Sequence, residues 1–200
     1  YVAHPADMCF KLPENMSTEE GALVEPLAVG LHATALGGVG LGSDVLILGG
    51  GCIGLVTLLS AKARGASRIV VVDLYEKRLN MAKEMGATEV INAQKENVAE
   101  RVEELFDGKG VDFVFETAGA IATIQQTPYY VKKGGTIVLV GMAAESMANY
   151  NFSQAMVKEI TIKTVFRYRN LYPTAIAAIS SGSIDVKKIV TNRFTFDESD

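Results

Sequence analysis

The sequence has few of the residues that build metal centres and covalent cross-links. Its 200 residues include no tryptophan, only two histidines, His4 and His32, and only two cysteines, Cys9 and Cys52. The cysteines form no C-x-x-C pair and no metal-binding pair, so we expect this chain to hold no metal ion of its own. This sparing use of cysteine favours a reducing compartment, and we expect the protein in the cytoplasm.

The sequence also lacks an excess of positive charge and a long apolar run. The formal net charge is −4, which argues against a nucleic-acid partner because such partners need a clustered basic surface. The uncharged run from Val45 to Ala61 has 17 residues, fewer than the roughly 20 of a membrane span. Its three consecutive glycines favour a strand, a turn and a helix instead. We therefore expect no membrane contact.

A starting methionine is missing too. The chain begins at Tyr1 and stops at Asp200 without finishing an element. We therefore expect it to be a piece of a longer protein.

What the chain does contain is the pattern of a dinucleotide site. Gly49, Gly51 and Gly54 satisfy G-x-G-x-x-G between a four-residue aliphatic strand and a helix. The first glycine makes a tight turn, the second lets the backbone approach a pyrophosphate, and the third allows close helix–strand packing. The N-terminus of the helix then faces the phosphates. Asp73 ends the second strand, where a carboxylate accepts hydrogen bonds from the adenosine ribose.

Strands and helices alternate along the rest of the chain. Ser17 to Glu20 is a capping-box sequence, which predicts a helix that bends near Pro26 and ends at Gly37-Gly38. Further helices are expected up to Arg64 and over 79–85, 98–106, 121–131 and 171–179. Strands are expected over 45–48, 68–73, 89–92, 111–116, 136–140 and 159–166, with a turn at 132–135, while 186–195 is ambiguous between strand and loop. This alternation predicts an α/β fold, a doubly wound parallel sheet (Rossmann fold) with six strands in the order 3-2-1-4-5-6.

In such a sheet, ligand groups cluster beyond the carboxyl ends of the strands. The candidates lie at Gly49–Ile53, which includes Cys52, and at Asp73, Thr117–Gly119, Val140–Met142 and Phe166–Tyr168. Asp73 favours NAD, because its carboxylate suits a free 2′-hydroxyl and repels a 2′-phosphate. Arg78 keeps NADP open, although it also suits an exposed helix position where its guanidinium covers the adenine.

Glu25 and His32 lie seven residues apart, so an uninterrupted helix would place them on one face. Pro26 stands between them. The pattern alone favours a surface acid for Glu25 and a packed core histidine for His32.

Several segments together resemble the medium-chain zinc dehydrogenases, most closely their sorbitol (L-iditol/xylitol) dehydrogenase branch. The resemblance covers essentially the whole chain. The segments that carry it are His4-Pro-Ala-Asp, Lys11-Leu-Pro, Glu20-Gly-Ala-Leu-Val-Glu-Pro-Leu-Ala-Val-Gly, the Gly49–Gly54 loop, Val140-Gly and Val165-Phe-Arg-Tyr.

The resemblance implies roles for individual residues. Glu25 would face the zinc-bound water or the substrate, and Arg167 and Tyr168 would approach a polyol. The nicotinamide end would be lined by Val140, Gly141, Met142, Val165, Phe166 and Arg167. Ile53, Asp73 and Arg78 match further cofactor contacts, whereas His32 keeps its structural interpretation.

The resemblance also implies a division of the chain and an activity. Residues 1–24 would belong to the catalytic domain, 25–167 to the NAD-binding domain, and 168–200 to the return toward the catalytic domain. The family's zinc ligands are absent here, so zinc is expected in the full-length protein only. The implied activity is hydride transfer between a polyol or secondary alcohol and NAD, in a homo-oligomer.

Two alternatives use the same cofactor residues. One is a non-catalytic dinucleotide-sensing module, which shares every cofactor contact. The other is a methyltransferase, against which the third glycine, Gly54, argues because its spacing suits a pyrophosphate.

Overall fold

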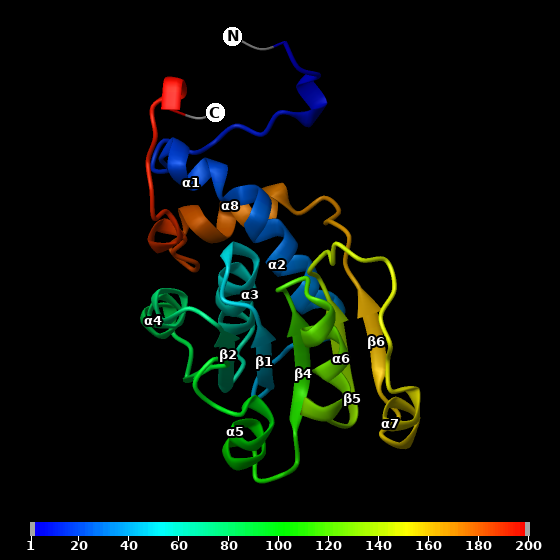
Figure 1. Cartoon of the computed structure of the whole chain (residues 1–200). Helices are drawn as coiled ribbons and strands as arrows, with labels where there is room; N and C mark the ends of the chain where they lie inside the picture. The colour runs from blue at the N-terminus through cyan, green and yellow to red at the C-terminus, as the bar shows by residue number, and fades with distance from the viewer. Residues whose placement is uncertain (1–2, 199–200) are drawn as a thin grey trace.

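The computed structural model describes residues 3–198, within which six parallel strands form one sheet (Figure 1). The strand order is β3-β2-β1-β4-β5-β6, which confirms the predicted topology. The strands are β1 (Asp44–Leu48), β2 (Arg68–Asp73), β3 (Glu89–Asn92), β4 (Val111–Glu116), β5 (Val131–Leu139) and β6 (Thr161–Thr164). The order reverses between β1 and β4, so their carboxyl ends flank the switch point where ligands bind in doubly wound sheets.

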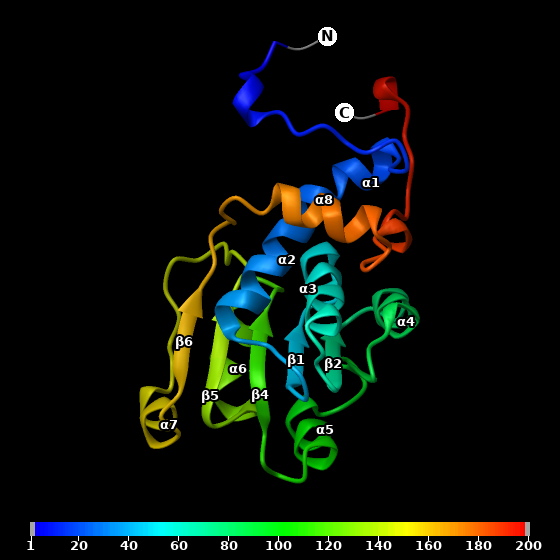
Figure 2. The same ribbon diagram turned by 180° about the vertical axis from the view of Figure 1, so that it is seen from behind.

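Helices cover both faces of the sheet (Figures 1 and 2). The α-helices are α1 (Thr18–Ala22), α2 (Val24–Gly37), α3 (Cys52–Ala63), α4 (Glu76–Met85), α5 (Val98–Leu105), α6 (Ile121–Tyr130), α7 (Phe152–Val157) and α8 (Tyr172–Ser180). Short 3-10 turns occupy Ala6–Met8, Lys187–Ile189 and Phe196–Glu198. In the described part of the chain no helix is long and apolar enough to cross a membrane.

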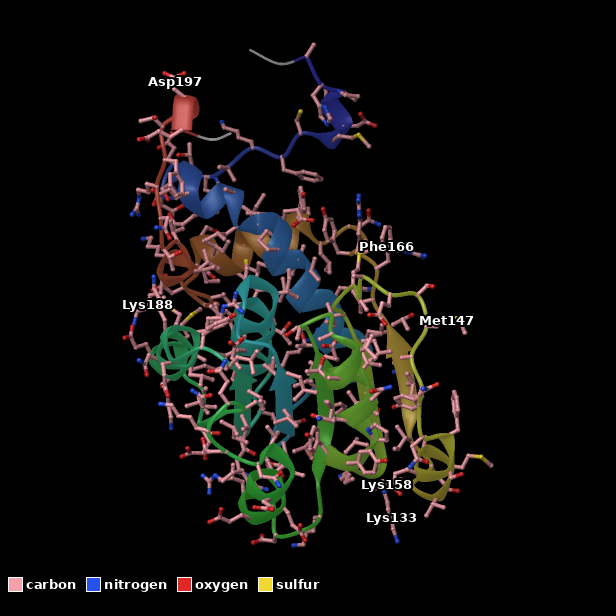
Figure 3. The ribbon with its side chains drawn as sticks, in the orientation of Figure 1. Lys133, Met147, Lys158, Phe166, Lys188 and Asp197 are labelled. Atoms are coloured by element: carbon pink, nitrogen blue, oxygen red, sulfur yellow. The ribbon has the colours of Figure 1, made fainter. Side chains whose placement is uncertain are left out.

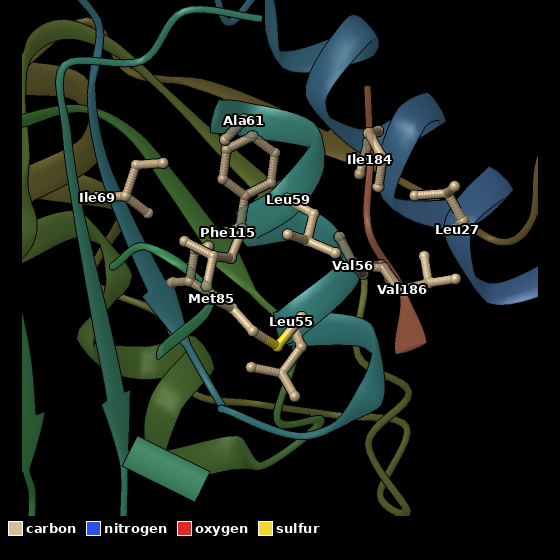
Figure 4. Packing of buried hydrophobic residues seen from close by; sticks show 14 of the residues in the cluster. Leu27, Leu55, Val56, Leu59, Ala61, Ile69, Met85, Phe115, Ile184 and Val186 are labelled. Atoms are coloured by element: carbon tan, nitrogen blue, oxygen red, sulfur yellow. The ribbon is translucent and has the colours of Figure 1, made fainter. Parts of the chain in front are cut away.

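Alternate residues of the central strands point into two separate cores. Val45 and Ile47 of β1 pack with α2, α3, α4 and α8, whereas Leu46 and Leu48 pack with α5 and α6. Figure 4 shows the first core, where Phe115 lies beside the apolar face of α3. A strand buried on both faces needs apolar residues at consecutive positions, which explains the aliphatic runs of the sequence.

The first helical segment breaks earlier than predicted. Ser17 caps α1 through the expected capping box with Glu20. The helix is interrupted at Leu23, which ends α1 and precedes α2. Pro26 therefore lies in the first turn of α2 and not at a bend. Proline is tolerated there because the first N–H groups of a helix have no intrahelical partner. Gly38 ends α2 in the left-handed conformation, as predicted.

Two other local predictions, the turn at Lys132–Gly135 and the length of the last strand, differ from the structure. The expected turn at Lys132–Gly135 lies inside β5 as an irregularity, where the register with β4 jumps from Val111–Val131 to Phe113–Thr136. Helix α7 was not predicted, and β6 is shorter than the expected strand. The ambiguous stretch 186–195 contains the short turn Lys187–Ile189 and no strand. The predicted domain boundaries remain predictions, and residues 1 and 200, at which they begin and end, lie outside the described residues.

Candidate functional site

The glycine loop between β1 and α3 has the geometry that the motif predicts. Gly49 adopts φ +108°, a conformation that side chains rarely tolerate. A Cβ on Gly54 would lie 1.9 Å from the Gly49 carbonyl oxygen, so only glycine permits this close packing. A Cβ on Gly51 would meet no atom within 4 Å. The backbone at Gly51 is therefore open on the side where a phosphate would approach, and the loop fits a dinucleotide.

Asp73 holds this loop against the end of β2. Its side chain is only 5% exposed, and it accepts hydrogen bonds from the Gly50 amide (2.7 Å) and the Tyr75 amide (2.9 Å). The guanidinium of Arg78 lies 3.4 Å from the same carboxylate and 5.1 Å from the ring of Tyr75. Asp73, the predicted ribose-binding acid, thus links the glycine loop to the segment that follows β2.

A cavity of about 310 Å³ lies beside the loop. Its lining comes from the glycine loop, α4 and the chain after α8, namely Gly50, Gly51, Cys52, Leu55, Lys77, Arg78, Met81, Ile189 and Thr191. The Cys52 side chain is exposed at this cavity, and its partial removal from water, followed by the charge of Glu25, raises the pKa of its thiol. The cavity therefore brings Gly51, Cys52 and Arg78 together, whereas the predicted contact Ile53 is half-buried and packs against the core.

The turn after β4 joins the glycine loop to the neighbouring strands. The Thr117 hydroxyl lies 3.0 Å from the carbonyl oxygens of Leu48 and Gly49, to which it donates. Gly119 adopts φ +66°, and a Cβ there would lie 2.6 Å from the Met142 carbonyl oxygen. The predicted residues of the β4 and β5 turns are therefore in direct contact.

Glu116, at the end of β4, was not among the predicted site residues. Its side chain is completely buried. One carboxylate oxygen, Oε1, accepts hydrogen bonds from the Ala118 amide (3.0 Å), the Gly119 amide (2.9 Å) and the Thr123 hydroxyl (2.7 Å). An acid at the carboxyl end of a buried strand is the signal that could have found it, since Asp73 occupies the same position on β2.

Beyond β5 and β6 the predicted nicotinamide-end residues differ in exposure. Val140 and Val165 are buried, whereas Met142, Phe166 and Arg167 are exposed. Figure 3 shows Phe166 beyond the end of β6, and the Arg167 guanidinium lies 5.1 Å from its ring. These exposed side chains leave an accessible surface next to the β5 turn.

The predicted catalytic residues Glu25 and Tyr168 both lie near Tyr172. The Tyr168 and Tyr172 hydroxyls are 3.0 Å apart. The hydrogen bond with Tyr172, burial and the nearby Glu25 raise the pKa of Tyr168. Glu25 lines a cavity of about 230 Å³ together with Phe10 and Tyr172, and Tyr168 lines an adjoining one of about 720 Å³ that also contacts Tyr172. His32 is half-buried on α2 and lines none of these cavities.

The described residues do not form a zinc site. Among residues 3–198, no group of three or more His, Cys, Asp and Glu side chains converges in a way that could hold a metal ion. A catalytic zinc needs three such protein ligands. The donor set of this part of the chain therefore does not fit the ion.

The family model for zinc-binding dehydrogenases matches residues 52–181. Among curated proteins, the zinc-type alcohol dehydrogenase-like protein YdjJ of Escherichia coli K12 is 50% identical over 98% of this chain. Human sorbitol dehydrogenase is 46% identical over all of it. The chain spans 56% of the length of each relative.

Two similar solved structures contain a dinucleotide. One is a zinc-binding dehydrogenase of Sinorhizobium meliloti bound to NADP, with a TM-score of 0.88 and 29% identity over 92% of this chain and 55% of that one. The other is an alcohol dehydrogenase of Escherichia coli CFT073 complexed with NADH, with a TM-score of 0.91 and 26% identity over 97% of this chain and 57% of that one.

Proposed function

Because the chain belongs to the zinc-binding dehydrogenase family, we propose that it is the coenzyme-binding part of an NAD-dependent alcohol or polyol dehydrogenase. The observation that carries this proposal is the open backbone of Gly51 beside the buried carboxylate of Asp73. A phosphate can approach the first, and a ribose hydroxyl can donate to the second. Relatives that are named sorbitol dehydrogenase support the polyol class.

In this proposal the chain's residues bind and orient the dinucleotide. Gly49, Gly51 and Gly54 bring the N-terminus of α3 to the pyrophosphate, and Cys52 begins that helix. Asp73 and Arg78 hold the adenosine ribose. The nicotinamide ring lies near the β4, β5 and β6 ends, where Thr117, Gly119, Val140, Gly141, Met142, Val165, Phe166 and Arg167 are proposed to contact it. When bound, the nicotinamide accepts or supplies the hydride.

We propose that NAD is preferred over NADP. One similar structure contains NADP and another contains NADH, so membership of the family does not decide which dinucleotide this chain prefers. Lys77 and Arg78 place positive charge in the cavity, which would suit a 2′-phosphate. The Arg78 guanidinium, however, faces the Asp73 carboxylate, whose charge repels a phosphate at the ribose.

The substrate end of the proposal rests on Glu25, Arg167 and Tyr168. Glu25 and Tyr168 line adjoining cavities that both contact Tyr172. The size and polarity of these cavities suit a small hydroxylated molecule. The described residues provide no zinc ligand set, so this chain by itself is proposed to bind NAD without turning over a polyol.

We also propose a homo-oligomer, formed through the edge of the sheet. Strand β6 pairs only with β5 among the described residues, and Ile162 on it is exposed. Exposed apolar side chains of α7, Phe152, Met156 and Val157, lie next in sequence. An unprotected edge strand of this kind pairs readily with another strand. Ultracentrifugation should find an oligomer that Ile162→Lys dissociates.

Calorimetric titration with NADH, NADPH and S-adenosylmethionine tests the dinucleotide assignment. We expect NADH to bind most tightly and S-adenosylmethionine not to bind. Alkylation provides a second measurement, because Cys52 lines the cavity and Cys9 does not. NADH should protect Cys52 and leave the rate at Cys9 unchanged. Equal rates at Cys52 with and without NADH would contradict the proposed location.

The alternative function, a non-catalytic dinucleotide sensor, shares these binding results. The product of the complete gene, assayed with sorbitol and xylitol, separates the two. Turnover supports the dehydrogenase, whereas tightly bound NAD(H) without turnover supports the sensor.

A further inference from the structure

Glu116 is a buried acid for which dinucleotide binding through the glycine loop gives no role. It lies at the carboxyl end of β4, on the switch-point side of the sheet. Its Oε1 accepts three hydrogen bonds, from Ala118, Gly119 and Thr123. Its Oε2 is buried and has no hydrogen-bond partner among the described residues. Burying an unsatisfied carboxylate oxygen is costly, so its presence calls for a reason.

The groups around Glu116 form two interlocked turns, residues 117–119 after β4 and 140–142 after β5. The Glu116 carbonyl oxygen accepts hydrogen bonds from the Val140 and Gly141 amides, both at 2.9 Å. A Cβ on Gly141 would lie 2.3 Å from the Gly119 nitrogen and 2.8 Å from Oε2 of Glu116. Glu116 therefore fixes the first turn through its side chain and the second turn through its backbone carbonyl. The two turns approach so closely at Gly119 and Gly141 that only glycine fits there.

The first turn also contacts the glycine loop. A Cβ on Gly49 would lie 2.8 Å from the Ala118 nitrogen, and Thr117 donates to the end of β1. The Glu116 carboxylate thus holds the turn 117–119, which contacts the glycine loop through Ala118 and the β5 turn through Gly119.

We propose that Glu116 is a positioning residue that holds the two turns in the shape that binds the nicotinamide half of the dinucleotide. The carboxylate is completely buried, so it acts through the turns and not by touching the ligand. This inference rests on the proposed function, since it assumes that the chain binds a nicotinamide dinucleotide. It predicts a selective defect, because the adenosine half is held by Asp73 and the glycine loop.

The test compares NADH with ADP-ribose, which lacks the nicotinamide ring, by calorimetric titration of the 200-residue chain. The measured quantity is the ratio of the two dissociation constants, ADP-ribose over NADH. Glu116→Met keeps the volume but cannot accept the three hydrogen bonds, and we expect it to lower this ratio about tenfold. Glu116→Gln keeps an acceptor oxygen at the Oε1 position and should retain the ratio within about threefold.

Two further variants separate positioning from general stability. Thr123→Val removes one donor to Oε1 and leaves the acid in place, so it should lower the ratio by about threefold and keeps the test usable if Glu116→Met does not fold. Glu20→Met is the matched control. Glu20 is also buried and accepts the Ser17 amide (2.8 Å), but it lies on α1. It should lower the melting temperature without changing the ratio.

The outcomes distinguish the two proposals. If the unmutated chain binds neither ligand, the proposed function fails and this inference fails with it. If it binds both ligands equally well, or if Glu116→Met and Thr123→Val change both affinities by the same factor, the chain remains a dinucleotide-binding protein and the role of Glu116 is refuted.

Discussion

Replacing Asp73 by alanine should both destabilise the chain and change its choice of dinucleotide. The carboxylate accepts the amides of Gly50 at 2.7 Å and Tyr75 at 2.9 Å. Each buried donor that loses its partner costs about 1–3 kcal/mol. Together the two amides should lower the free energy of unfolding by about 3 kcal/mol, less than the 5–15 kcal/mol of a typical domain. The variant should therefore still fold.

Loss of the negative charge of Asp73 should change the affinities for NADH and NADPH in different ways. Hydrogen bonds to an ionised group contribute about 1.5–3 kcal/mol, so NADH should bind Asp73→Ala about tenfold to a hundredfold more weakly. NADPH should lose much less or gain, because the variant no longer repels a 2′-phosphate and leaves the Arg78 guanidinium, now 3.4 Å from Asp73, free to pair with it. The preference for NADH should shrink by about tenfold or more.

Calorimetric titration with both dinucleotides measures this preference, and urea unfolding measures the stability. Asp112→Ala is a suitable control, because Asp112 also accepts a backbone amide, that of Asp44, at 2.7 Å. It lies at the amino ends of the strands, far from the ligand groups, so it should lose stability and keep the preference. If NADPH binds the unmutated chain at least as tightly as NADH, or if Asp73→Ala weakens both dinucleotides equally, the assigned role of Asp73 is wrong.

Further predictions concern single groups. Gly54→Ala should abolish folding in thermal melts, because its Cβ would lie 1.9 Å from a carbonyl oxygen, whereas Gly51→Ala should fold normally and bind NADH at least tenfold more weakly in titrations. Burial raises the pKa of Asp112, but the Asp44 amide and Lys132 outweigh burial and lower it below its ordinary value. Because the folded-state pKa is the lower one, this stabilisation is present above about pH 4 and lost as the pH falls. Asp112→Asn should therefore flatten the acid limb of urea-unfolding curves between about pH 5 and 2, and an unchanged limb would contradict this. Glu25→Gln should leave the melting temperature unchanged, since Glu25 is exposed, and should slow polyol turnover at least tenfold in the product of the complete gene; unchanged turnover would make it a surface acid. Metal analysis of this chain, purified without chelator, should find far less than one zinc per chain, and stoichiometric zinc would refute the ligand assignment.

The sheet could be predicted from the sequence because its signals are local. Consecutive aliphatic residues such as Val45–Leu48 mark strands buried on both faces, and glycines such as Gly38 and Gly86 end helices in the left-handed conformation. Helix α7 gave no such signal, since it has only six residues and leaves Phe152 and Met156 exposed. Its local signal is the N-cap Asn151, whose side chain accepts the Gln154 amide at 3.0 Å, and without an apolar stripe this cap alone does not predict a helix.

The irregular start of β5 was missed for a related reason. Lys132-Lys-Gly-Gly is a typical turn sequence, and Gly134 does adopt a positive φ. The segment is nevertheless held in the sheet, because Lys132 pairs with Asp112 and the Gly134 amide donates to the Lys158 carbonyl oxygen at 2.7 Å. Both partners are distant in sequence, so tertiary contacts decide the conformation here.

Asp73 and Glu116 show why the two halves of the candidate site were not equally predictable. Both acids end a buried strand, and both accept backbone amides of the loop that follows. A carboxylate at this position satisfies amides that a tight turn leaves without a partner, so it stabilises the loop whether or not a ligand is present. The Asp73 carboxylate also borders the glycine loop, where the spacing of a known motif draws attention to it. Glu116 supports turns that have no such motif, so its place at the strand end is a weaker signal, and its role comes from its hydrogen bonds and from the contacts of Gly119 and Gly141. If the proposal for Glu116 holds, the same device orders the adenosine half and the nicotinamide half of one dinucleotide site.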